Sequence, residues 1–304
     1  MGDLGIDTSL RPVGEGRFRG RLSRDWEIWG PMGGYLASFA LRAAGAHCGL
    51  PRPASLVGHY LGVGTFHDDR DHDNRDHDDL DHDNLGEHDL EIECTTLRRA
   101  RTAESVRVTI AQDGRPLFEA LVWGVTTGLA GLDHHASAMP VAPHWRDCPT
   151  VEERVAAAGL EYEAWYPFWN NLDQRPPRWR DDWNERATRS EPPEWMQWLR
   201  FRPAATFADP WLDACRLLIL VDLGSWPAVQ GHHNQGDVIA PSIDIACEFH
   251  RIDPAAEWLF AAGHAPSAAD GLIGAHMHVW NDSGVLLASG VSQLLCRPVP
   301  AAPT

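Results

Sequence analysis

The apolar positions of the chain fall into two helices that are hydrophobic on nearly every side. The first spans about 35–46 and is rich in alanine. The second begins at Asp209, an N-cap residue followed by a proline in the first turn, and ends at Asp222. A helix that is apolar all round is buried. We therefore predict two central helices, each covered by other elements.

Segments in which apolar and polar residues alternate follow each helix. This alternation predicts half-buried strands at 55–60, 90–97, 105–110 and 117–125, and again at 195–201, 242–250, 258–262, 272–280 and 285–296. Asp113-Gly114 predicts a hairpin turn between two of these strands. An antiparallel sheet curled around one helix covers that helix on nearly all sides. The predicted fold class is therefore α+β, with two such units in tandem.

The pattern also divides the chain. We place an N-terminal unit at 1–126 and a C-terminal unit at 195–304, joined by a linker at 127–194 that is rich in Trp and Pro and packs through its aromatic side chains. Residues 67–89 interrupt the first unit with a five-residue His/Asp repeat that has no apolar face. We interpret it as a disordered acidic insertion. Loose binding of zinc or nickel is the alternative, but a flexible array lacks the fixed geometry of a metal site.

Charge and cysteine usage limit the classes of function. The net charge is −17, and the segment 67–89 supplies −9 of it, with eleven acidic residues against two arginines. This balance argues against nucleic acid or an anionic membrane as partner. The six cysteines have no CxxC spacing, residues 1–19 contain no apolar h-region, and no apolar run reaches transmembrane length. We expect a cytoplasmic protein with reduced cysteines, no metal site and no cofactor.

Three features carry candidate chemistry. Asp222 closes an apolar helix, where the helix dipole and burial both disfavour its charge, although many such residues are simply solvated. Gly33 and Gly34 begin the first helix without a side-chain cap, so their amides can hold a carbonyl oxygen or a phosphate, or they serve only a tight turn and close packing. Arg98 and Arg99 can meet a phosphorylated ligand, or they form a solvated loop.

Several motifs together resemble a known family. Gly33-Gly34-Tyr35-Leu36 before an alanine-rich helix resembles the first half of a double-hotdog acyl-CoA thioesterase of the thioesterase II type. The second half is similar at Ser242-Ile243-Asp244, at Phe249-His250-Arg251, at Glu257-Trp258-Leu259 and at the Gly-Val-Leu-Leu-Ala-Ser strand. The resemblance covers 26–62, 90–126 and 195–298. It implies a tandem hotdog fold, an acyl-CoA or other acyl thioester as substrate, no cofactor, and assembly into homo-oligomers.

The resemblance also implies a site. In that family an Asp, a Thr or Ser, and a Gln hold the attacking water, and the first two match Asp222 and Ser242. The place of the Gln falls on Ser292, with Gln293 one residue later. A one-residue shift turns a strand side chain to the opposite face, so Gln293 serves only if a bulge re-aims it. The expected substrate contacts are Gly33, Gly34, Tyr35, Arg98 and Arg99.

Three functions follow from the resemblance. The first is hydrolysis of acyl-CoA by a water that Asp222 activates. The second is a non-catalytic acyl-thioester-binding hotdog protein that has lost the Gln, and Met32, in place of a common Asn, is a second departure. The third, a hotdog dehydratase or hydratase, needs a His near an Asp at a helix start, and the sequence has no such pair. A GxSxG elbow and metal-ligand spacing outside the repeat are also absent from the sequence.

Overall fold

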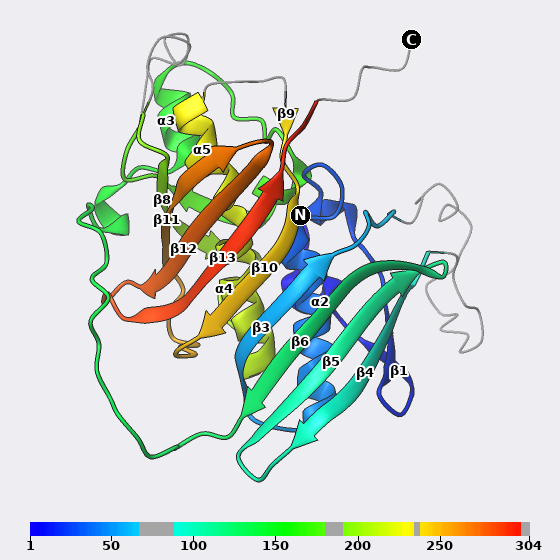
Figure 1. Ribbon diagram of the computed structural model, residues 1–304. Helices are drawn as coiled ribbons and strands as arrows, with labels where there is room; N and C mark the ends of the chain where they lie inside the picture. The colour runs from blue at the N-terminus through cyan, green and yellow to red at the C-terminus, as the bar shows by residue number, and fades with distance from the viewer. Residues whose placement is uncertain (67–87, 180–190, 234–237, 299–304) are drawn as a thin grey trace, which may run out of the picture.

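The computed structural model describes residues 1–66, 88–179, 191–233 and 238–298. Within them, twelve strands form one antiparallel sheet in the order β1-β2-β4-β5-β6-β3-β10-β13-β12-β11-β8-β7 (Figure 1). The strands are β1 (Arg11–Gly14), β2 (Arg17–Gly20), β3 (Arg52–Tyr60), β4 (Leu90–Arg99), β5 (Ala103–Gln112), β6 (Arg115–Val125), β7 (Leu172–Arg175), β8 (Glu194–Phe201), β10 (Ser242–Phe249), β11 (Leu259–Ala269), β12 (Leu272–Asn281) and β13 (Leu286–Leu295). The short strands β9 (Val238–Ile239) and β14 (Arg297–Pro298) pair separately.

The two halves of the chain meet in the middle of this sheet. Strand β3 of the first half pairs with β10 of the second, with Leu56 opposite Cys247. On either side the strands form antiparallel meanders, as the alternating pattern predicts. The predicted tandem α+β architecture is therefore confirmed, and the two sheets are continuous.

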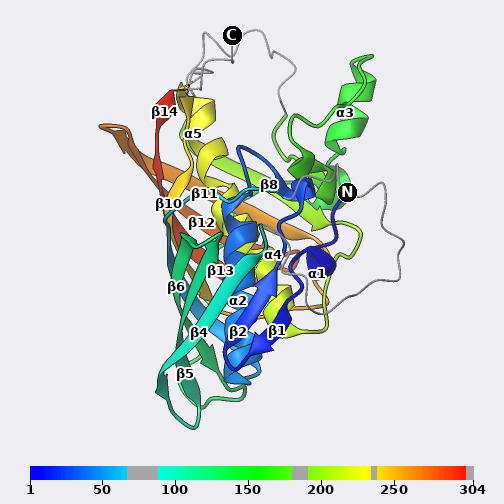
Figure 2. The ribbon, with the colours of Figure 1, turned by 90° about the vertical axis from the view of Figure 1, so that its right-hand side faces the viewer.

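The two apolar helices, α2 (Gly33–Cys48) and α4 (Pro210–Leu223), lie side by side against one face of the curved sheet (Figures 1 and 2). They run antiparallel, because the start of α2 meets the end of α4. A Cβ on Gly34 would lie 2.7 Å from the Cα of Ile219, so the backbones touch only because residue 34 is a glycine. This contact brings Asp222, in the last turn of α4, against the N-terminus of α2.

Helix α4 is less uniformly apolar than its pattern suggests. Asp213 and Arg216, one turn apart, are completely buried and form an ion pair of 2.7 Å. The guanidinium also donates to the carbonyl oxygens of Ala205 and Ala256 at 2.8 and 2.9 Å, and the Asp213 carboxylate accepts from the Phe207 amide. The pair therefore ties α4 to the loops around it.

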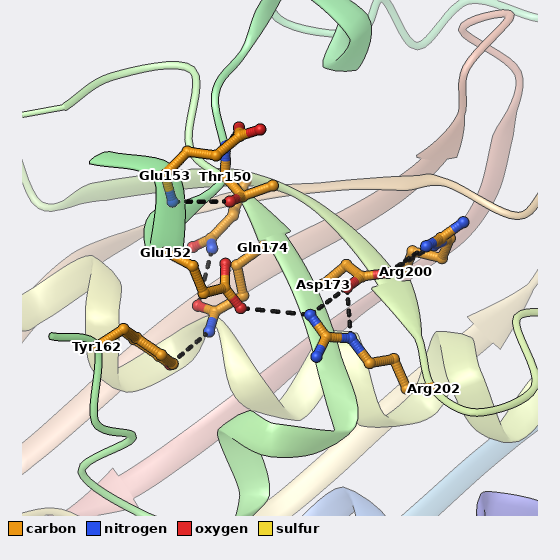
Figure 3. A network of polar contacts seen from close by, with 9 residues as sticks. Thr150, Glu152, Glu153, Tyr162, Asp173, Gln174, Arg200 and Arg202 are labelled. Carbon is orange, nitrogen blue, oxygen red and sulfur yellow. Dashed lines mark hydrogen bonds and ion pairs between the residues drawn. The ribbon is translucent and has the colours of Figure 1, made fainter. Parts of the chain in front are cut away.

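Residues 127–179 pack against the second half of the sheet. They contribute η3 (Trp145–Asp147), α3 (Val151–Ala157) and η4 (Pro167–Asn171). They also contribute the edge strand β7, which the sequence pattern did not predict. Trp145 stacks on Trp258 with ring centroids 5.1 Å apart. In Figure 3, Asp173 of β7 accepts hydrogen bonds from Arg200 and Arg202 of the β8 region. Aromatic and charged contacts both hold this segment in place.

The remaining helices are α1 (Leu4–Asp7), η1 (Arg24–Trp26) and α5 (Ser225–His233). The cysteines are unpaired, and four of the six are buried. Among the described residues, no helix has the length and apolar character needed to cross a membrane.

Residues 67–87 of the acidic repeat lie outside the described residues, but the chain on either side of them is held together. The side-chain amide of Gln112 donates to the carbonyl oxygens of Thr65 and His88 at 2.9 and 2.6 Å, and its oxygen accepts from the Thr65 amide. One side chain at the end of β5 therefore fixes both ends of the insertion.

Removing the repeat is expected to leave the fold unchanged. Replacing 67–87 with a short Gly-Ser linker should alter the free energy of unfolding by less than about 1 kcal/mol, because loop-closure entropy varies slowly with length. Urea unfolding of the two proteins measures this difference. A loss of several kcal/mol in the shortened protein would show that the repeat packs against the fold.

Candidate active site

Asp222 is 8% exposed, and both of its carboxylate oxygens are hydrogen-bonded. Oδ2 accepts from the Gly34 amide at 2.8 Å, and Oδ1 accepts from the Ser242 hydroxyl at 2.8 Å. Burial raises the pKa of Asp222 above its ordinary value, although the bonds from Ser242 and Gly34 act in the opposite direction. Asp222 is thus a buried carboxylate held in one orientation, and not a solvated residue at a helix end.

A β-bulge in β10 delivers Ser242 to this carboxylate. Ser242 lies opposite Leu294, whereas Asp244 lies opposite Gln293, so Ile243 is an extra residue in β10. In a regular strand Ser242 and Asp244 would point to the same face. The inserted residue reverses this relation and turns Ser242 toward α4.

The bulge does not re-aim Gln293, because it lies in β10 and not in β13. A Cβ on Gly290 would lie 2.6 Å from the Val221 side chain of α4, so positions 290, 292 and 294 face the helix. Ser292 is buried there, and its hydroxyl donates to the Asp244 carbonyl at 2.8 Å. Gln293 therefore lies on the opposite face of the sheet, where its backbone amide donates to Asp244 Oδ1 at 2.9 Å.

The start of α2 differs from the uncapped start that the sequence predicts. The Met32 thioether accepts from the Tyr35 amide at 3.3 Å, and Asp222 occupies the Gly34 amide. The Tyr35 hydroxyl donates to the Asp7 carbonyl at 2.8 Å, and its ring stacks on Trp26. Tyr35 is consequently a core residue, and the prediction of a bare helix start was wrong.

Gly33 also borders the carboxylate. A Cβ on Gly33 would lie 2.7 Å from Asp222 Oδ2 and 2.9 Å from the Tyr60 hydroxyl. Tyr60 belongs to no motif of the sequence. Its one signal was its place on the inward face of the predicted strand, in step with Leu56.

Arg98 and Arg99 are not brought to this site. Arg99 pairs with Glu104 at 2.8 Å, and Glu104 accepts from Thr96, which is hydrogen-bonded to His47 in the last turn of α2. Asp222 lies at the opposite end of this helix of 16 residues, a length of about 24 Å. These arginines therefore lie away from Asp222, and their contact with a phosphorylated ligand stays a prediction.

Comparisons with known proteins show the family of this chain. Residues 145–296, half of the chain, match the family described as the acyl-CoA thioesterase C-terminal domain. The chain belongs to the acyl-CoA thioesterase family. No curated protein matches its sequence.

Solved structures show the fold of this family member over its whole length. It is similar to a putative thioesterase II from Thermobifida fusca, with 19% identity, 98% of each chain covered and a TM-score of 0.74. It is also similar to the acyl-CoA thioesterase II TesB2 from Mycobacterium marinum, with 20% identity, 98% and 99% covered and a TM-score of 0.72. The chain is therefore a double hotdog, as predicted. The chain is less similar to the dehydratase domain of RzxB from Pseudomonas fluorescens, with 13% identity, 93% and 94% covered and a TM-score of 0.52. Because a dehydratase shares this fold, the fold alone does not select hydrolysis.

The tandem fold of this thioesterase-family protein places a second, equivalent position at the other end of the helix pair. Gly45 lies eleven residues after Gly34 in α2, and Trp211 lies eleven residues before Asp222 in α4. The Trp211 indole lies 2.5 Å from the place of a Cβ on Gly45 and donates to the Leu50 carbonyl at 2.7 Å. Trp211 therefore fills this second position.

Proposed function

We propose that the protein hydrolyses acyl-CoA, or another acyl thioester, with a water that Asp222 holds and deprotonates. The observation that carries the proposal is the buried Asp222 carboxylate, fixed by Gly34 and Ser242. Membership of the acyl-CoA thioesterase family supports the substrate class. No cofactor is required for this chemistry.

The reaction balances with Asp222 alone as proton acceptor and donor. The water oxygen bonds to the thioester carbonyl carbon while Asp222 takes one of the water protons. When the tetrahedral intermediate collapses, the carbon–sulfur bond breaks, and the thiolate receives that proton from Asp222. The products are the free acid and the CoA thiol. A raised pKa suits both steps, because it makes the carboxylate a better base and keeps its acid form available.

Ser242 is assigned the task of holding the base. Its hydroxyl donates to Asp222 Oδ1. The other oxygen, Oδ2, lies on the Gly33 side and is therefore the one closest to the reacting groups. We assign Ser292 the role of stabilising the bulge, since its hydroxyl donates to the Asp244 carbonyl. We assign no chemical role to Gln293.

The proposal is tested by release of free CoA from a panel of acyl-CoAs of increasing chain length. The wild-type protein should release CoA from at least one member. Absence of turnover, together with tight binding of the same acyl-CoAs, would instead favour the non-catalytic binding protein.

A pair of substitutions on neighbouring strands tests the assignment of the hydroxyl. Ser242→Ala should lower kcat by about 10- to 100-fold, because it removes a hydrogen bond to a charged group. Gln293→Ala, on the outer face of β13, should leave kcat within about twofold, since surface substitutions have small effects. Equal losses in the two variants would contradict the assignment.

A further inference from the structure

The hydroxyl of Tyr60 is buried and has no hydrogen-bond partner among the described residues. It lies beside the place of the Gly33 Cβ, as does Asp222 Oδ2. Folded proteins pair nearly all buried polar groups with protein or with bound molecules. An unpaired hydroxyl next to a buried carboxylate therefore points to a ligand that accepts a hydrogen bond from this hydroxyl.

The surrounding side chains fix the Tyr60 ring. The ring packs against Phe118 with centroids 4.9 Å apart. Phe118 can reach this position only because residue 58 is a glycine, since a Cβ there would lie 2.3 Å from the Phe118 ring. The hydroxyl is thus presented from β3, in the first half of the chain, to a carboxylate from the second half.

The charge environment makes Tyr60 a hydrogen-bond donor. Burial raises its pKa well above the ordinary value, and the negative charges of Asp222 and Asp244 raise it further. The phenol therefore keeps its proton at neutral pH. Direct donation to Asp222 is not observed, so the proton is available to a bound molecule.

We propose that Tyr60 is a further catalytic residue, whose hydroxyl donates a hydrogen bond to the carbonyl oxygen of the thioester and stabilises the negative charge that forms there. This inference rests on the proposed hydrolysis. Water addition requires an acceptor for the water proton and a donor for the carbonyl oxygen, and these must converge on adjacent atoms. Asp222 Oδ2 and the Tyr60 hydroxyl meet this requirement, because they lie 2.7 and 2.9 Å from one point, the place of a Cβ on Gly33. The phenol proton stays on Tyr60 throughout, and no bond to Tyr60 forms or breaks.

Tyr60→Phe tests this role with the smallest change of shape. We expect kcat to fall by about 100-fold, the usual effect of losing one oxyanion donor, and KM to rise by about tenfold, because the same hydrogen bond is made to the carbonyl of the bound thioester. The melting temperature should stay the same or rise, because an unpaired buried hydroxyl is removed. Tyr162→Phe is the matched control, because its hydroxyl accepts from Gln174 in the polar network of Figure 3. It should leave kcat unchanged.

Binding of two inert analogues separates this inference from the proposed function. One is a ketone in which a methylene replaces the thioester sulfur of acyl-CoA, and the other is a thioether that lacks the carbonyl. Tyr60→Phe should weaken the ketone about tenfold and leave the thioether unchanged. If that selective loss occurred in a protein without turnover, it would support the hydrogen bond from Tyr60 to the carbonyl oxygen and reject hydrolysis. An unchanged kcat in an active protein, or equal effects on the two analogues, would overturn the role of Tyr60.

Discussion

Replacing Asp222 with Asn is expected to lower kcat/KM for acyl-CoA hydrolysis by about 10²–10⁴-fold. The amide has nearly the shape of the carboxylate: its oxygen can still accept from the Gly34 amide and its NH2 group can donate to the Ser242 hydroxyl, but it cannot take a proton from water. Binding of a non-hydrolysable acyl-CoA should therefore be retained. Steady-state release of CoA measures the loss, and full activity in the variant would remove Asp222 from the mechanism.

The same substitution should not weaken the fold. The pKa of Asp222 is raised in the folded protein, so the folded state disfavours the ionised form. The corresponding loss of stability sets in as the pH rises through that raised pKa. Asn carries no such penalty, so the variant should be at least as stable at neutral pH. Thermal unfolding at neutral and at acid pH checks this, and it separates loss of chemistry from loss of structure.

The largest expected effect on stability comes from the buried ion pair of α4. Asp213→Ala leaves the Arg216 guanidinium without its carboxylate in the interior, and we expect a loss of about 3–5 kcal/mol in the free energy of unfolding. Urea unfolding measures it.

Two controls accompany this measurement. Glu119→Ala breaks the exposed pair with Arg107 and should cost less than about 1 kcal/mol. Replacing Asp213 and Arg216 together with Leu and Met should cost less than Asp213→Ala alone, because no charge is then left unpaired. A loss below about 1 kcal/mol for Asp213→Ala would mean that the pair does not tie α4 to its loops.

Periodicity predicted the tandem architecture well, because buried helices and half-buried strands leave different repeats in a sequence. Asp222 was also recognisable, since a carboxylate at the end of an apolar helix is unusual. The ion pair inside α4 was not, because Asp213 and Arg216 look like two ordinary polar positions until both are seen to be buried.

The finer geometry of the site depends on contacts between distant parts of the chain. The bulge at Ile243 appears only when β10 is aligned with β13, and it decides that Ser242 reaches α4. Tyr60 belongs to the other half of the chain and reaches Asp222 only because β3 pairs with β10. Neither relation has a local sequence signal.

The central claim is that buried Asp222 is the base of a thioesterase, and CoA release as a function of pH tests it most directly. Wild-type protein should hydrolyse acyl-CoA with a kcat/KM that rises with pH through one ionisation above the ordinary pKa of an aspartic acid, and Asp222→Asn should lack this rise. Absence of CoA release by the wild-type protein, or the same pH profile in both proteins, would contradict the account.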